Sequence, residues 1–167
     1  MSDLKTLSKE AIPEALEKAK HYRVLNEPWH AESICLDILE ISPDNQEATY
    51  IMILAITDQF GSKFKTSLRE TLEKTSLVKD EYEKYYCKGL IYERQATTAL
   101  KRATPRANYI AYDFLCSAME WYEKAEKIKP RNNDETILRW NSCTRLMIKY
   151  KLEAEKEDFG VQPFLDV

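Results

Sequence analysis

Two histidines and four cysteines are the side chains of this sequence best suited to metal binding or nucleophilic chemistry. His21 and His30 are expected on successive helices, where they could approach each other, but zinc needs three or four ligands. Cys35 follows His30 on the same predicted helix, about 140° further around its axis. No two cysteines form a CxxC pair, and a thiol in an apolar helix packs as a small hydrophobic group. We therefore expect no metal site, no cofactor and four reduced cysteines: Cys35, Cys87, Cys116 and Cys143.

Acidic side chains could act as general acids, bases or metal ligands, but most of them fall within four residues of a lysine. Glu14 with Lys18 and Glu123 with Lys127 have the spacing of ion pairs on a solvated helix face. A di-metal helical bundle needs a Glu-x-x-His motif from each of two helices, and the sequence does not have two. The residue pattern therefore predicts that the chain is not an enzyme.

Composition restricts the classes of fold and partner. The chain has 167 residues and only 3 glycines, and both tight β-hairpins and phosphate-binding loops depend on glycine. With 25 basic and 28 acidic residues the net charge is -3, which argues against a nucleic-acid partner. The sequence has no signal-peptide pattern and no apolar run of the roughly 20 residues that a spanning helix needs. We therefore expect a cytoplasmic protein without a membrane partner.

Proline and helix-capping residues divide the chain into segments of similar length. Such residues mark the first turn of a helix or the position just before it. The residues expected to begin or cap helices are Pro13, Pro28, Asp44, Ser62, Asp80, Thr104 and Asp134. Seven helices are predicted in this way, over residues 13–25, 28–41, 44–60, 62–75, 80–103, 104–129 and 134–158.

Apolar and small residues recur every three or four positions, which is the spacing of one helix face. The two longest stripes run from Tyr82 to Ala103 and from Ala111 to Ile128, and their aromatic members are expected to pack between helices. No segment of useful length alternates apolar and polar residues as a strand would. Because the connections are short, neighbouring helices must pack antiparallel. The predicted fold is therefore all-α, with about seven helices.

Two segments, residues 29–48 and 115–135, repeat one pattern of small and large side chains. The matching positions are Ala31 and Ala118, Cys35 and Tyr122, Ile38 and Ala125, and Pro43 and Pro130. The pattern resembles the second helix of a tetratricopeptide repeat. Gly89, between Tyr85 and Tyr92, is similar to the small residue at the close approach in the first helix of that family.

The resemblance implies an α-solenoid of antiparallel helical hairpins over residues 1–158, followed by a tail at residues 159–167. More residues separate Gly89 from Ala118 than a repeat unit of about 34 residues leaves between these positions. We therefore expect an elongated third hairpin that projects beyond its neighbours. The tip of this hairpin is basic, with Lys101, Arg102 and Arg106.

In tetratricopeptide repeats the first helices of successive units line a concave face, which implies that partners bind there. The corresponding residues are Lys20, Arg23, Tyr50, Asp58, Tyr86, Glu93, Arg94, Asn141 and Arg145. The expected function is a non-catalytic scaffold or adaptor for a protein or peptide partner whose identity no motif specifies. The alternative is a self-associating structural module that pairs through the projecting hairpin or the tail. The tail would dock either on its own array or on another molecule.

Overall fold

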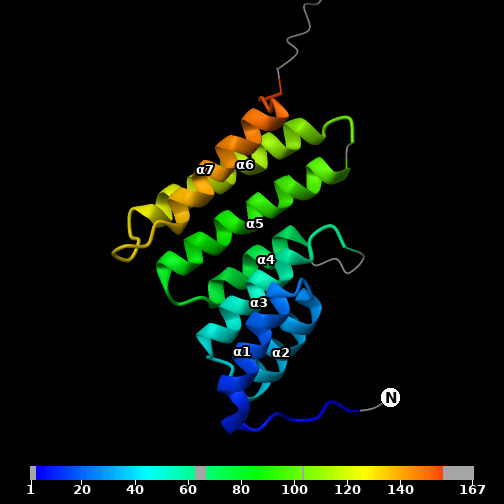
Figure 1. Ribbon diagram of the computed structural model, residues 1–167, viewed down its shortest axis with the longest axis vertical. Helices are drawn as coiled ribbons and strands as arrows, with labels where there is room; N and C mark the ends of the chain where they lie inside the picture. Colours follow the sequence, from blue (N-terminus) through cyan, green and yellow to red (C-terminus); the bar gives the residue numbers. More distant parts are fainter. Residues whose placement is uncertain (1–2, 63–66, 103, 156–167) are drawn as a thin grey trace, which may run out of the picture.

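The computed structural model describes residues 3–62, 67–102 and 104–155, in which every regular element is helical (Figure 1). The all-α prediction is therefore confirmed. Two short 3-10 helices, η1 (Lys9–Ala11) and η2 (Thr75–Leu77), precede α1 and follow α4. Over these ranges the seven α-helices are α1 (Ile12–Val24), α2 (Pro28–Ile41), α3 (Gln46–Asp58), α4 (Leu68–Lys74), α5 (Glu81–Arg102), α6 (Ala107–Glu126) and α7 (Glu135–Tyr150).

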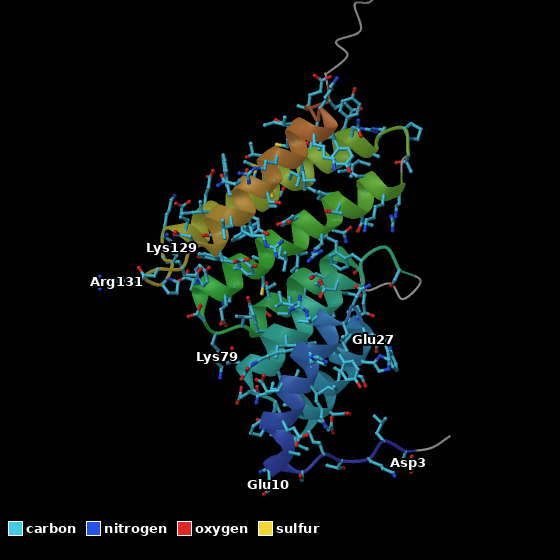
Figure 2. All side chains as sticks on the ribbon, in the orientation of Figure 1. Asp3, Glu10, Glu27, Lys79, Lys129 and Arg131 are labelled. Carbon is cyan, nitrogen blue, oxygen red and sulfur yellow. The ribbon has the colours of Figure 1, made fainter. Side chains whose placement is uncertain are left out.

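The helices pack in successive groups, and neighbouring groups have one helix in common: α3 joins the first group to the second, and α5 joins the second to the third. α1 packs on α2 and α3, α3 packs on α4 and α5, and α6 packs on both α5 and α7. Figure 1 shows the result as an elongated stack, with α1, α2 and α3 at one end and α5, α6 and α7 at the other. Charged side chains point outward along the whole stack, as Glu10, Glu27, Lys79 and Arg131 illustrate (Figure 2).

The core consists of three clusters of buried side chains along the stack. Cys35 and Met52 belong to the first cluster, between α1, α2 and α3. Ile53 and Cys87 belong to the second cluster, which joins α3 to α5. Leu115 belongs to the third, where α5, α6 and α7 meet. Because α3 and α5 each contribute to more than one cluster, the apolar surface buried against water continues from one end of the stack to the other.

Capping residues set the starts of α3 and α5. Asp80 caps α5 as predicted, since its Oδ1 accepts a hydrogen bond from the Glu83 amide at 2.8 Å. The predicted cap of α3 is wrong. Asn45 takes that place instead of Asp44, because Asn45 Oδ1 accepts from the Ala48 amide at 2.9 Å. The satisfied amide is one of the first-turn donors that a helix leaves without an internal partner.

The predicted starts of α4 and α6 are also wrong. Ser67 caps α4 in place of Ser62, because Ser67 and Glu70 form a reciprocal capping box across the first turn. α6 begins at Ala107 and not at Thr104. The Thr104 carbonyl instead accepts a hydrogen bond from the Ala107 amide at 2.9 Å, so the predicted first turn is a separate turn ahead of the helix.

α7 ends at Tyr150, earlier than the predicted end at residue 158. Lys151 adopts a left-handed conformation with φ 51°, and the Leu152 amide donates to the Met147 carbonyl at 2.9 Å. The Lys151 amide donates to the Ile148 carbonyl at 3.2 Å, and the two bonds together form a Schellman motif. Leu152 also packs against the third core cluster. This packing favours the end of the helix at Tyr150. Residues 156–158 lie outside the described ranges.

The longest helices, α5 with 22 residues and α6 with 20, form one hairpin, about 30 Å long at 1.5 Å per residue. Gly89 and Ala118 lie inside it as predicted. Ala118 is fully buried, and a Cβ placed on Gly89 would lie 2.5 Å from Cε1 of Tyr122. The hairpin does not project beyond α7, contrary to expectation. α7 follows α6 to the tip, where Arg106 pairs with Glu155.

Candidate functional site

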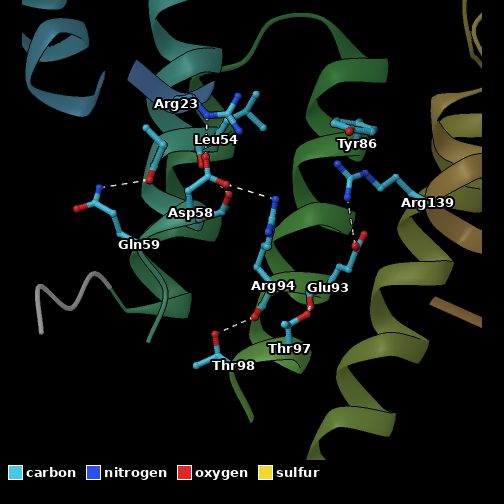
Figure 3. A network of polar contacts seen from close by, with 12 residues as sticks. Arg23, Leu54, Asp58, Gln59, Tyr86, Glu93, Arg94, Thr97, Thr98 and Arg139 are labelled. Atoms are coloured by element: carbon cyan, nitrogen blue, oxygen red, sulfur yellow. Dashed lines mark hydrogen bonds and ion pairs between the residues drawn. The ribbon is translucent and has the colours of Figure 1, made fainter. Parts of the chain in front are cut away.

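The nine predicted binding residues all lie on odd-numbered helices. α1 contacts α3, α3 contacts α5, and side-chain hydrogen bonds link α5 to α7. Five of the nine take part in two polar clusters, which we name the Asp58 cluster and the Glu93 cluster (Figure 3). The Asp58 cluster contains Arg23, Asp58 and Arg94. The Glu93 cluster contains Tyr86, Glu93, Tyr122, Glu135 and Arg139.

The Asp58 cluster joins three helices through one carboxylate. Arg23 Nε, on α1, donates to Asp58 Oδ2 at 2.8 Å. Arg94 Nη2, on α5, lies 3.3 Å from Asp58 Oδ1. The Asp58 side chain is 16% exposed and that of Arg94 is 38% exposed. Because these charges are partly shielded from water, their mutual attraction exceeds that of a fully exposed pair.

Arg94 has hydrogen-bonding capacity that its neighbours do not use. A guanidinium carries five N–H donors. The Nε of Arg94 is buried and has no partner among the described residues, while Nη2 makes only the long contact with Asp58. Leaving a buried donor unpaired costs about 1–3 kcal/mol. An additional acceptor could approach Arg94 through the exposed part of its guanidinium group, since the side chain is 38% exposed and the Nε atom itself is buried.

The Glu93 cluster buries a carboxylate between α5, α6 and α7. Glu93 is only 6% exposed. Its Oε2 accepts from the Tyr122 hydroxyl at 2.6 Å and its Oε1 from Arg139 Nη1 at 3.3 Å. The Tyr86 hydroxyl donates to Glu135 Oε1 at 3.0 Å. A buried carboxylate needs such partners to offset its lost hydration, so these bonds hold the three helices in one arrangement.

Two tyrosines and an arginine of the Glu93 cluster keep their protonation states near neutral pH. Burial raises the pKa of Tyr86 to about 12, and burial together with Glu93 raises the pKa of Tyr122 above its ordinary value. Burial acts to lower the pKa of Arg139, but Tyr86 and Glu93 outweigh it, so the pKa of Arg139 is raised. A general acid or base works best with a pKa near the operating pH. These three groups therefore hold structure together and are unsuited to proton transfer.

The other four predicted residues take no part in either cluster. Lys20 is exposed and pairs with Glu47 of α3 at 2.5 Å. Tyr50 is half-buried and packs against the second and third core clusters. The side chains of Asn141 and Arg145, on α7, make no hydrogen bond or ion pair within the described part of the chain. These two side chains remain available on that helix.

Three residues of the Glu93 cluster are not among the predicted binding residues. Tyr122 occupies a position that the repeat pattern assigns to helix packing. Its hydroxyl also donates a hydrogen bond to Glu93. Glu135 and Arg139 are four residues apart on α7 and pair at 3.4 Å. That spacing is the sequence signal that could have identified them.

The histidines and cysteines occupy packed or ordinary surface positions. Within the described ranges no group of three or more His, Cys, Asp and Glu side chains is placed to hold a metal ion. His30 stacks on Tyr22, with ring centroids 5.3 Å apart. All four cysteines are free, and burial raises the pKa of Cys35, Cys87 and Cys143 to about 12. Such thiols are largely protonated and therefore weakly nucleophilic at neutral pH.

Comparison of the chain with protein-family models, with curated proteins and with solved structures finds no match. Among the described helices, none combines the length and the apolar character needed to cross a bilayer.

Proposed function

We propose that this chain is a non-catalytic protein–protein interaction module with a tetratricopeptide-like arrangement, which binds a protein or peptide along its odd-numbered helices. The observation that carries the proposal is the Asp58 cluster. There, side chains from α1, α3 and α5 meet at a partly exposed point, and Arg94 retains unused donors. Stacked helical hairpins suit this role because one helix from each hairpin contributes to a continuous surface.

The pattern of helix contacts supports a two-row arrangement. α1 packs on α3 and α3 packs on α5. Side chains of α2 and α4 line one shallow pocket, and side chains of α4 and α6 line another. Odd-numbered helices thus contact one another in addition to their even-numbered neighbours, as in an array of tetratricopeptide-like hairpins. We name the surface formed by α1, α3, α5 and α7 the odd-helix face.

The charges on the odd-helix face indicate the chemistry of the partner. Arg23, Arg94 and Arg139 supply positive charge, and Asp58 and Glu135 supply negative charge. A planar guanidinium can bind a carboxylate with two parallel hydrogen bonds. We therefore expect a partner segment of mixed charge, with one acidic side chain placed against Arg94.

A capture experiment with matched variants tests this proposal. The immobilised protein, a double variant Arg23→Ala/Arg94→Ala and a control Arg69→Ala/Arg131→Ala are each exposed to source-cell lysate. Arg69, on α4, and Arg131, in the loop between α6 and α7, are both exposed, so the control removes the same charge at positions outside the Asp58 cluster. We expect the wild type and the control to retain one protein that the Arg23→Ala/Arg94→Ala variant loses. Equal retention by all three proteins, with helical content unchanged, would contradict the proposal.

Self-association is a second candidate function, and the outer side of α7 favours it. Leu138 is 62% exposed and Ile148 is 72% exposed on this last described helix. A second copy could cover them. Of the two pairing elements predicted from the sequence, the hairpin does not project beyond α7, and the tail at residues 159–167 lies outside the described residues. Light scattering at tens of micromolar protein decides between the two candidate functions, because a strict monomer is incompatible with self-association.

A further inference from the structure

Two lysine side chains lie over the ring of Trp121. The Nζ atoms of Lys88, on α5, and Lys124, on α6, are 4.2 Å and 4.0 Å from the ring centroid. A cation over an indole face is attracted by the negative charge of the π system. Trp121 therefore binds two ammonium groups through its ring at the junction of α5 and α6.

These ammonium groups have no carboxylate partner in the described part of the chain. Lys84, Lys88 and Lys124 form no ion pair there, whereas Lys18 and Lys20 pair with nearby glutamates. Burial lowers the pKa of Lys88, and the charges of Lys84 and Lys124 lower it further. Three like charges thus accumulate without internal compensation, and a bound anion would relieve their repulsion.

An open groove adjoins this lysine cluster. It lies between α4, η2, α5 and α6 and has a volume of about 510 Å³. Its lining is Leu72, Glu73, Thr75, Ser76, Lys84, Lys88, Tyr92 and Trp121. Apolar surface from Leu72, Tyr92 and Trp121 therefore lies directly beside unpaired positive charge.

The groove is separate from the odd-helix face. Lys88 and Glu93 are both on α5, but five residues at 100° each place them about 140° apart around its axis. Glu93 faces α7 through Arg139, while Lys88 lines the groove beside α4. A ligand in the groove would therefore leave the odd-helix face free.

We propose that this groove binds an acidic peptide segment of a partner protein. Its carboxylates pair with Lys84, Lys88 and Lys124, and an apolar side chain of the segment lies against Trp121. The apolar lining favours a peptide over a polyphosphate chain.

Nuclear magnetic resonance of the tryptophan indole N–H groups tests the proposal. The chain has three tryptophans, and a Trp121→Phe variant assigns the signal of Trp121. The probe is a capped hexapeptide with four glutamates, one leucine and one phenylalanine, and the comparison peptide carries glutamines in place of the glutamates. We expect the glutamate peptide alone to shift the Trp121 signal saturably, with an affinity that falls as salt is added.

Charge-removing variants identify the groups responsible. Lys88→Gln/Lys124→Gln is expected to weaken peptide binding by about tenfold or more. The matched control Lys5→Gln/Lys9→Gln removes the same charge from exposed, unpaired lysines and should bind as the wild type does. Circular dichroism and thermal unfolding verify that both variants are folded.

Several outcomes would overturn the proposal. These are equal shifts from the glutamine peptide, equal weakening by the Lys5→Gln/Lys9→Gln control, or the absence of a saturable shift. Inorganic phosphate, a single-stranded deoxythymidine oligonucleotide and vesicles with anionic lipid are titrated separately. Tighter binding of any of these than of the glutamate peptide would overturn the assignment to an acidic protein segment.

Discussion

Tyr122 fills the space that Gly89 leaves between α5 and α6. A Cβ at residue 89 would lie 2.5 Å from Cε1 and 2.6 Å from Cδ1 of the ring. The ring is fully buried, and its hydroxyl donates to Glu93 at 2.6 Å. Because the ring cannot move away without losing that bond, glycine is required at residue 89 to provide room and not for a special backbone conformation.

Replacing Gly89 with alanine should therefore destabilise the protein. Alanine favours a helix over glycine by about 1 kcal/mol, but overpacking against Tyr122 opposes this gain, and we expect a net loss of about 1–3 kcal/mol. Urea unfolding measures the change. In a Tyr122→Leu background the same replacement should cost little, because the ring is gone. A Gly89→Ala variant more stable than the wild type would show that α5 and α6 are further apart than described.

Alkaline pH should destabilise the fold through buried tyrosines and thiols. The pKa of Tyr86 is raised to about 12 in the folded state, and it is about 10 in the unfolded chain. Above pH 10 the unfolded chain releases its proton first, so the free energy of unfolding falls as pH rises. Below pH 10 this contribution is fully present, and roughly 3 kcal/mol of stability is lost as pH rises through 12.

A Tyr86→Phe variant tests this pH dependence. Its free energy of unfolding should fall less steeply between pH 10 and pH 12 than that of the wild type, because one titrating group is absent. Replacement of the exposed Tyr150 by phenylalanine serves as the control and should leave the slope unchanged. A wild-type slope retained in Tyr86→Phe would contradict the burial of that hydroxyl.

Packing residues are more predictable from this sequence than polar partners. The close approach at Gly89 and Ala118 follows from local spacing, because one helix face repeats every three to four residues. The hydrogen-bonding partners of Glu93 do not follow from local spacing. Arg139 is 46 positions away, and no local pattern indicates which arginine reaches a given carboxylate. The nine predicted binding residues hence include Glu93 but not Arg139.

At the scale of elements, local capping chemistry predicted the starts of α2 and α5 but not the start of α6. α2 begins at Pro28 as predicted, and Asp80 caps α5. Ser62 and Ser67 are both able to cap a helix, and only Ser67 has a glutamate three residues later to complete the box. No glycine directly follows Tyr150, so the sequence gives no local indication that α7 ends there. Lys151 adopts the left-handed position there, which the packing of Leu152 favours and which local sequence does not reveal.

The tip of the α5–α6 hairpin should tolerate reversal of its charge. Lys101, Arg102 and Arg106 are exposed, and the pair of Arg106 with Glu155 lies at the surface. Such a pair contributes at most about 1 kcal/mol. Changing the three residues to glutamate should therefore lower the melting temperature by no more than about 4 °C.

Differential scanning calorimetry checks this expectation. A Lys101→Glu/Arg102→Glu variant, which keeps Arg106, isolates the part due to the pair with Glu155. A drop above about 10 °C in the triple variant would mean that the tip is packed against other parts of the protein or against a second copy.

At the scale of the whole molecule, the stack offers two surfaces of different chemistry. The odd-helix face carries paired charges of both signs around Asp58 and Glu93. The groove at Trp121 carries unpaired positive charge beside apolar side chains. Because the two surfaces lie on different sides of α5, one protein could bind two segments at once. This capacity suits an adaptor.

Site-specific photo-crosslinking tests most directly whether a partner binds the odd-helix face. A photoreactive amino acid is placed at Lys20 of α1 or Thr97 of α5, and in control proteins at the exposed Glu40 of α2 or Asp113 of α6. The proteins are irradiated in lysate or with the captured partner. We predict that residues 20 and 97 crosslink to the same partner and that residues 40 and 113 do not. Crosslinks from residues 40 and 113 alone would contradict the account.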